Sequence, residues 1–274
     1  RLVVCGNFLP QIAMTSTQNL DVTAMRVLIA WGFSQGMQIG TVDVKTAFLN
    51  AEIKGWERVL IAPPSALVRM GVMRTGDFWV AEKAFYGLKE SPKAWEETRD
   101  QVLKDLTIEF KGKTLRLAQS VTHSSIWLIV QEPDATDTAD TEITHNAYGT
   151  LPFLPKGKGK VIGGLGVYVD DLLTMGSLEV VQAILARIQK VWDTSEPEIL
   201  GEKGCVKTTY LGVTLEIDQT PWSCVTRLFL HQTNYMHMVV DKFEQGRPLT
   251  TKDTPGVALH AGGEARVELS LIHI

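Results

Sequence analysis

The stretch LGVYVDDLLTMG, residues 165–176, decides the fold, because it places two adjacent carboxylates in an otherwise apolar run. Burial of an unpaired carboxylate is strongly disfavoured, and two side by side also repel each other, so Asp170 and Asp171 need a compensating cation. The apolar residues on either side predict two short strands that meet at a tight turn. The carboxylates would then lie at the tip of a hairpin, where both can reach one site.

A third acid is expected elsewhere in the chain, because this arrangement suits Mg²⁺, a hard ion that takes oxygen ligands. The best candidate is Asp43, a single acid at the end of an apolar, strand-like run in MQIGTVDVKTAFLNAEI, residues 37–53. It lies far from Asp170 in the sequence, so only the fold can bring the two together. Two-metal phosphoryl-transfer sites use carboxylates of this kind as ligands, and their two ions lie about 4 Å apart.

Three motifs follow one another in the order DVKTAFLN at residues 43–50, FYGLKESPKAW at 85–95 and YVDD at 168–171. With the flanking segments RLVVCGNF, TTYLGVTLEI and FLHQTNYMHMVVDKF, they resemble the reverse transcriptase of copia-type LTR retrotransposons over nearly the whole chain. The resemblance implies an α/β fold, a right-hand polymerase palm with an antiparallel sheet backed by helices, plus partial fingers. It implies a reverse transcriptase domain over 1–243. Residues 132–160 begin with an acidic stretch poor in large apolar groups, which predicts a flexible insertion where the family has a shorter connection. The final residues match nothing expected in the family, so 244–274 is interpreted as a connecting tail that is disordered or foreign to the family.

The resemblance also assigns roles to single residues. Asp43 and Asp170 match the two metal-binding aspartates of the polymerase palm, and Asp171 matches the third carboxylate beside them. Phe48 falls where the family has an aromatic ring that closes the pocket beneath the incoming sugar, where it would clash with a 2′-hydroxyl and select deoxynucleotides. Without the motif, Phe48 would be interpreted as a core residue.

Further residues are assigned to the nucleotide. In the family, the segment from Tyr86 to Lys89 lies beside the nucleotide and the template base, with Gly87 allowing close approach of the backbone. Arg1 matches a basic residue that helps to hold the triphosphate, because a guanidinium suits phosphate geometry. The alternatives are a turn glycine for Gly87, a solvated charge for Lys89 and a frayed terminus for Arg1.

A helix is predicted for residues 92–106, because Ser91 can cap it and the proline that follows is tolerated in the first turn. Apolar residues recur on one face of this helix, so that charged residues such as Glu96 and Asp100 are expected to face solvent. The resemblance assigns Ser91, and Tyr168 of the hairpin, to the primer and template.

The later part of the chain has three further predicted elements. An amphipathic helix at 178–193 should cover the sheet. Residues 206–217 and 224–232 predict a strand pair that resembles the family's primer-side region. A last helix is expected near 233–243.

Composition limits the function classes. The 274 residues include 45% apolar residues, enough for a large core in one extended domain or two subdomains. No apolar run approaches the roughly 20 residues that cross a membrane, and no signal peptide opens the sequence, so no membrane partner is expected. The absence of an initiating Met indicates a piece of a longer polyprotein.

The formal charge of −4 is unusual for a nucleic-acid binder, although binding depends on a local basic track rather than on the total.

The expected function is that of an RNA-directed DNA polymerase, a nucleotidyltransferase that adds deoxynucleotides to a primer 3′-hydroxyl with two Mg²⁺ ions, or Mn²⁺ in their place. Expected partners are an RNA or DNA template with its primer, deoxynucleoside triphosphates, and the rest of the Pol polyprotein with its integrase and ribonuclease H. Virus-like particles in the cytoplasm, and the nucleus, are the expected locations. Two other interpretations stay open: an inactive or domesticated nucleic-acid-binding relic of this fold, and a two-metal nuclease.

Overall fold

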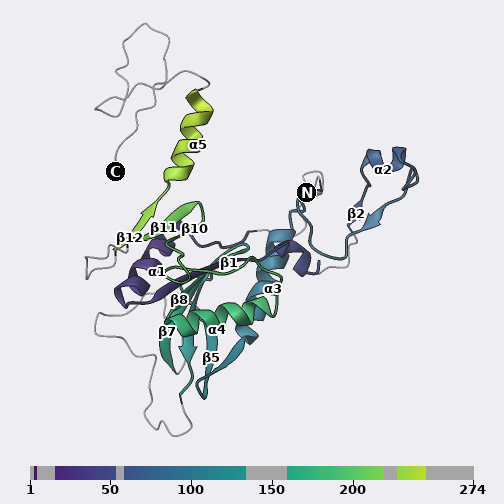
Figure 1. The fold of residues 1–274 in the computed structure, drawn as a ribbon. Helices are drawn as coiled ribbons and strands as arrows, with labels where there is room; N and C mark the ends of the chain where they lie inside the picture. The colour runs from purple at the N-terminus through teal and green to yellow at the C-terminus, as the bar shows by residue number, and fades with distance from the viewer. Residues whose placement is uncertain (1–2, 5–15, 54–58, 134–158, 219–226, 245–274) are drawn as a thin grey trace, which may run out of the picture.

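A seven-stranded antiparallel sheet forms the centre of the structure, a computed structural model that describes residues 3–4, 16–53, 59–133, 159–218 and 227–244 (Figure 1). Its strands are β1 (Gln38–Asp43), β4 (Thr107–Phe110), β5 (Lys113–Gln119), β6 (Ile126–Gln131), β7 (Lys160–Tyr168), β8 (Asp171–Gly176) and β9 (Glu198–Ile199). Their order across the sheet is β4-β5-β6-β7-β8-β1-β9. Strands β7 and β8, from the opening stretch of sequence, therefore lie beside β1 in the middle of the sheet.

Helices cover both faces of this sheet, and the alternation of side chains along the strands decides which residues face which layer. Helices α3 (Ser91–Asp105) and α4 (Leu178–Gln189) pack with Leu172, whereas α1 (Val22–Ser34) packs with Leu173, its neighbour in β8. The helix expected at 178–193 is confirmed as a cover of the sheet. It ends earlier than predicted, at Gln189, but Trp192 beyond it stays buried in the same cluster.

A second, three-stranded sheet contains β10 (Lys207–Tyr210), β11 (Val213–Asp218) and β12 (Arg227–His231). The single strand predicted over 206–217 is wrong, because the chain reverses at Leu211 and Gly212. Both residues have positive φ, 53° and 70°, as in the tight hairpin turns whose twist matches that of the flanking strands. The second sheet contacts the first through Tyr210, whose buried hydroxyl donates a hydrogen bond of 3.2 Å to the Gly166 carbonyl of β7.

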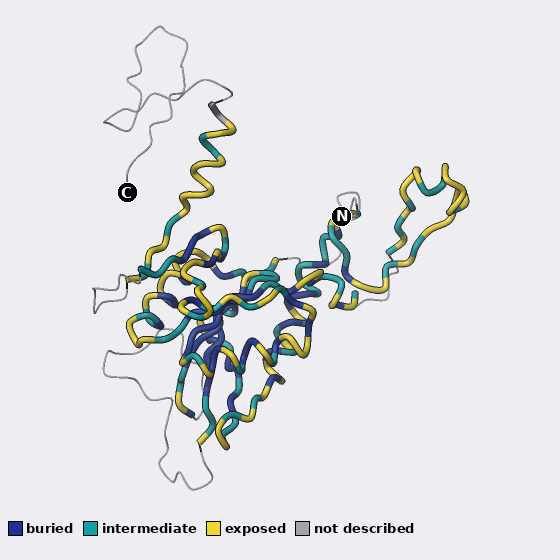
Figure 2. The backbone as a smooth tube through the Cα atoms, viewed as in Figure 1, coloured by how far each residue is buried: buried dark blue, intermediate teal, exposed yellow. Residues whose placement is uncertain are grey.

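Two elements project from this body. Helix α5 (Thr233–Glu244) follows β12, which confirms the helix predicted near 233–243, and Figure 2 shows it largely exposed. The other projection is an arm of β2 (Leu60–Ile61), α2 (Ser65–Arg69) and β3 (Trp79–Val80). No helix of the described residues is both long and apolar enough to span a membrane.

The expected α/β class, an antiparallel sheet backed by helices, is confirmed. Most of the insertion expected at 132–160 and of the tail expected at 244–274 lies outside the described residues. The helix predicted at 92–106 is confirmed as α3, but its first residue is Ser91 and its N-cap is Glu90, so the predicted Ser91 cap is wrong.

Gly87, in the loop before α3, has a φ of +96°, and a Cβ atom there would lie 1.9 Å from the carbonyl oxygen of Val4. The N-terminal segment is held at this point, because the Val4 N–H donates a hydrogen bond of 2.8 Å to the Tyr86 carbonyl. The backbone that lies close to Gly87 in this structure is therefore that of Val4, in the same chain.

Substitution of Gly87 by Ala should destabilise the protein through both backbone strain and the clash with Val4. Gly76→Ala is a matched control, because Gly76 has a φ of +94° but nothing within 4 Å of the added Cβ. We expect Gly87→Ala to lower the free energy of unfolding in denaturant by at least about 1 kcal/mol more than Gly76→Ala does. Equal losses in the two variants would contradict the role given to Val4.

Candidate active site

The turn between β7 and β8 consists of Val169 and Asp170, and Asp171 begins β8. The hairpin predicted from the sequence is therefore confirmed, with its two carboxylates at the tip. Val169 has a φ of +49°, a conformation that is a genuine outlier for a β-branched residue. Such a backbone persists only where its surroundings hold it, and it occurs most often at functional sites.

The fold brings Asp43 to this hairpin, as expected. Asp43 is the last residue of β1 and pairs with Asp171 in the β1–β8 register, while Tyr168 pairs with Asp171 across the hairpin. Directly opposed residues of antiparallel strands project from the same face of a sheet, with Cβ atoms about 5 Å apart. Tyr168, Asp171 and Asp43 thus form a row across three adjacent strands.

The backbone around Asp43 is fixed by a segment that the sequence did not single out. The Asp43 N–H donates a hydrogen bond of 3.0 Å to Ser195 Oγ, and its carbonyl accepts one of 2.8 Å from the Ser195 N–H. The next residue, Val44, donates its N–H to the Asp170 carbonyl at 2.9 Å. A lone serine after a helix carries no recognisable pattern, so Ser195 could be found only from the structure.

The carboxylates act on one another electrostatically. Burial raises the pKa of Asp171 to about 6, and the negative charges of Asp170 and Asp43 contribute to this rise. Burial also raises the pKa of Tyr210 well above its ordinary value, with the charge of Asp171 as a further cause. Asp171 therefore lies within electrostatic reach of both the other two acids and the second sheet.

The donor set at the hairpin suits a hard divalent cation, because Asp43, Asp170 and Asp171 offer only carboxylate oxygens. The pKa of Asp171 is raised first by burial and then by the negative charges of Asp170 and Asp43, which a bound cation would compensate. Within the described residues, however, no group of three or more His, Cys, Asp or Glu side chains is arranged to hold a metal ion. The structure thus brings the acids together on neighbouring backbone positions without defining a coordination geometry.

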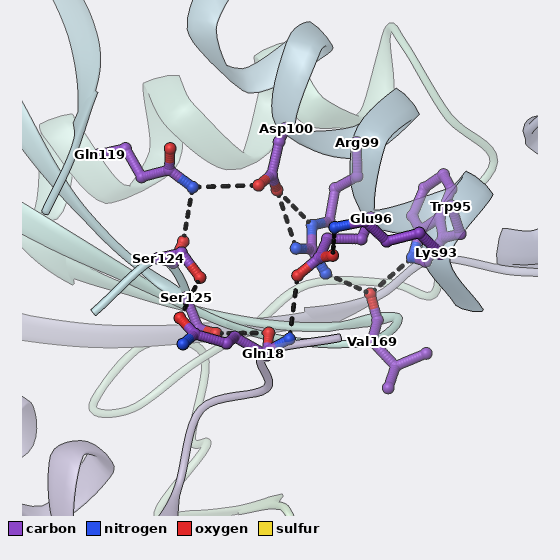
Figure 3. A network of polar contacts seen from close by, with 10 residues as sticks. All are labelled: Gln18, Lys93, Trp95, Glu96, Arg99, Asp100, Gln119, Ser124, Ser125 and Val169. Carbon is purple, nitrogen blue, oxygen red and sulfur yellow. Dashed lines mark hydrogen bonds and ion pairs between the residues drawn. The ribbon is translucent and has the colours of Figure 1, made fainter. Parts of the chain in front are cut away.

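Side chains of helix α3 form hydrogen bonds to the backbone of the turn, as Figure 3 shows. The indole Nε1 of Trp95 donates to the Val169 carbonyl at 2.7 Å, and Nη1 of Arg99 approaches the same oxygen at 3.4 Å. The Arg99 side chain is only 2% exposed and pairs with Asp100 at 2.8 Å. Asp100 also accepts a hydrogen bond of 3.0 Å from Gln119 of β5.

The prediction that Glu96 and Asp100 face solvent is therefore wrong. Glu96 is buried and accepts a hydrogen bond of 3.0 Å from the Gln18 backbone, together with an ion pair of 2.6 Å from Lys93. Asp100 is partly buried beside Arg99. Helical periodicity alone could not predict this burial, because it assigns every charged position to solvent. The charges of Glu96 and Asp100 are instead compensated by partners inside the protein.

The resemblance assigned Ser91 to the primer and template, whereas its side chain is buried in this structure. Ser91 is 1% exposed, and its hydroxyl accepts a hydrogen bond of 2.8 Å from the Phe85 N–H and donates one of 2.7 Å to the Phe85 carbonyl. The side chain thus closes the loop before α3 instead of facing a ligand.

Two residues assigned to the nucleotide lie together. Phe48, on a short 3₁₀ helix at Ala47–Asn50 after β1, meets Tyr86 edge to face, with ring centroids 4.9 Å apart and an interplanar angle of 60°. Both rings are half-buried, as is Lys89, and Tyr168 is exposed. Arg1 lies outside the described residues.

Asp171 gives the metal-free protein a defined pH dependence. Its carboxyl ionises near pH 4 in the unfolded chain and near pH 6 in the folded one, so the folded state binds more protons between these values. Stability should therefore fall as the pH rises from 4 to 6. With EDTA present, we expect Asp171→Asn to be more stable than the unaltered chain above pH 6 by about 1 kcal/mol after allowance for solvent screening. A stability difference that stays constant from pH 4 to pH 7 would contradict this assignment.

Comparison with known proteins finds one family model that matches part of the chain. Residues 9–130 match a family model described as reverse transcriptase (RNA-dependent DNA polymerase), and the match includes Asp43, Phe48 and the loop before α3. No curated protein and no solved structure matches the chain. The matched residues end before the β7–β8 hairpin, but the register of β1 and β8 sets Asp43 directly opposite Asp171. Residues 9–130 of the chain are therefore similar to the reverse transcriptase domain found in copia-like retrotransposons.

Proposed function

We propose that this domain is the palm and part of the fingers of an RNA-directed DNA polymerase, with Asp43, Asp170 and Asp171 as ligands of two Mg²⁺ ions. The observation that carries the proposal is the pairing of Asp43 with Asp171 at the tip of the central hairpin. It joins an acid from the family-matched part of the chain to two acids beyond it. The proposed domain spans residues 1–243, and 244–274 is its connecting tail.

When bound, the two ions supply positive charge that stabilises the attacking and leaving oxygens of phosphoryl transfer. The chain holds the acids where such charge is needed: Ser195 fixes the backbone of Asp43, and Val44 fixes the carbonyl of Asp170. Tyr168, exposed beside Asp171, would contact the primer end.

The nucleotide would enter beside Phe48 and Tyr86. Their edge-to-face contact forms a half-buried aromatic wall, in which Phe48 lies five residues after Asp43 in the chain. A cavity of about 810 Å³ lies nearby, lined by the arm at Leu60 and Trp79 and by Leu49 and Phe85. We propose the arm as part of the fingers, and an RNA or DNA template with its primer and deoxynucleoside triphosphates as the substrates.

The parent protein, on this proposal, is a Pol polyprotein with integrase and ribonuclease H parts, located in cytoplasmic virus-like particles and in the nucleus. An inactive relic of the same fold is the second candidate. It is disfavoured because all three acids are retained and their backbone positions are held by hydrogen bonds from Ser195 and Val44.

Asp170→Asn should abolish Mg²⁺-dependent primer extension on an RNA template, because it removes one of the charges that would hold the ions. Asp105→Asn, an exposed change at the end of α3, is the matched control and should keep full activity. Thermal unfolding would show that both variants fold. Unchanged extension by Asp170→Asn would refute the polymerase assignment, and primer-template binding without extension by the unaltered chain would favour the relic. Degradation of the substrate without added nucleotides would indicate a nuclease.

Phe48→Ala should weaken discrimination against ribonucleotides if the ring lies beneath the incoming sugar. We expect the ratio of kcat/KM for a deoxynucleotide to that for the matching ribonucleotide to fall by about tenfold or more. Partial unfolding affects both substrates equally, so the ratio isolates the effect of the ring. A variant that loses stability but keeps the ratio would show that Phe48 is only a packing residue.

A further inference from the structure

We propose that Trp95 and Arg99 are positioning residues for the carboxylates: by holding the Val169 carbonyl, they fix the direction in which Asp170 projects. The inference rests on the proposed function, because it concerns the same acids. The turn between β7 and β8 has only two residues, and Asp170 lies between two of its peptide groups.

Both of those peptide groups are held from outside the hairpin. The carbonyl before Asp170, that of Val169, accepts from Trp95 Nε1 at 2.7 Å. The carbonyl of Asp170 itself accepts from the Val44 N–H at 2.9 Å. Peptide groups are planar, so holding the two that flank one Cα atom fixes its φ and ψ, and with them the direction of its Cβ atom. The position of the Asp170 carboxylate is thus set jointly by α3 and by the end of β1.

The turn needs this support because Val169 adopts a φ of +49°. A β-branched residue in this region is strained and would relax to another conformation without compensating contacts. Relaxation would rotate the peptide that precedes Asp170. A strong hydrogen bond to the Val169 carbonyl opposes that rotation directly.

Arg99 strengthens the support through charge. Its guanidinium is almost fully buried and is held in place by Asp100, which Gln119 fixes in turn at 3.0 Å. Gln119 also donates to the Ser124 carbonyl at 2.8 Å, so the chain of contacts runs from the sheet to the turn (Figure 3). Burying this ion pair is costly, and a pair retained at such a cost is consistent with a role in fixing one conformation.

The hydrogen bond of Trp95 can be removed without removing the aromatic packing of its side chain. It packs edge to face on Trp192, with ring centroids 5.3 Å apart, so Trp95→Phe keeps an aromatic contact while removing the indole donor. Trp127 in β6 offers a matched control. It is fully buried in the same cluster, and within the described part of the chain its indole N–H has no hydrogen-bond partner. Trp127→Phe therefore makes the same change in volume without the loss of a hydrogen bond.

The first measurement is Mn²⁺ binding to the whole chain, followed by electron paramagnetic resonance. We expect Trp95→Phe to weaken Mn²⁺ affinity by about tenfold, the low end of the loss found when a hydrogen bond that orients a metal ligand is removed. Trp127→Phe should bind Mn²⁺ as the unaltered chain does. In primer extension, Trp95→Phe should raise the Mg²⁺ concentration for half-maximal rate and lower kcat, with the KM for nucleotide little changed.

The second measurement needs no metal. Hydrogen exchange of the backbone amides in residues 165–176 should be faster in Trp95→Phe than in Trp127→Phe when the two are compared at equal distance below their melting temperatures. Arg99→Met should also speed exchange, and Arg99→Lys, which keeps a buried cation, should restore part of the protection. Equal exchange in the two tryptophan variants would overturn the proposal.

Failure of the proposed function has a different signature. A chain that binds Mn²⁺ through Asp170 but extends no primer would contradict the polymerase assignment, while the affinity ratio of the two tryptophan variants would still decide the positioning role. If the unaltered chain binds no Mn²⁺, the exchange rates decide it instead.

Discussion

The pairing of β1 with β8 is the constraint on which the rest of the structure depends. It places two carboxylates, Asp43 and Asp171, directly opposite each other on antiparallel strands, an arrangement that like charges oppose. Strand pairing in the middle of a sheet, between two apolar layers, outweighs that repulsion. The electrostatic cost that remains is visible in the pKa of Asp171, which burial and the neighbouring acids raise to about 6.

The surrounding elements each fix one part of this arrangement. Ser195 and Val44 hold the end of β1 against the hairpin, and α3 holds the turn through Trp95 and Arg99. The second sheet approaches through Tyr210, which donates to Gly166 of β7. Asp43 and the hairpin acids are thus held by backbone contacts from several distant segments, as a preorganised site requires.

The three acids that the structure brings together share a strong local pattern in the sequence. Asp170 and Asp171 interrupt an apolar run, and Asp43 ends one, so burial next to charge was evident without a structure. The errors have a common physical cause as well. Glu96 and Asp100 are charged residues on a helix, and periodicity assigned them to solvent. Their actual partners, among them Gln18 and Arg99, are defined by tertiary packing.

Local sequence patterns specify the hairpin, the strand that ends at Asp43, the amphipathic helices and the motifs that resemble a polymerase family, because each depends on residues close together in the chain. Tertiary structure alone decided that Asp43 faces Asp171, that Ser195 holds Asp43, and that Trp95 and Arg99 hold Val169. These are hydrogen bonds and strand pairings between residues far apart in sequence. Their existence depends on strand order and register, which local patterns of apolar and polar residues do not specify.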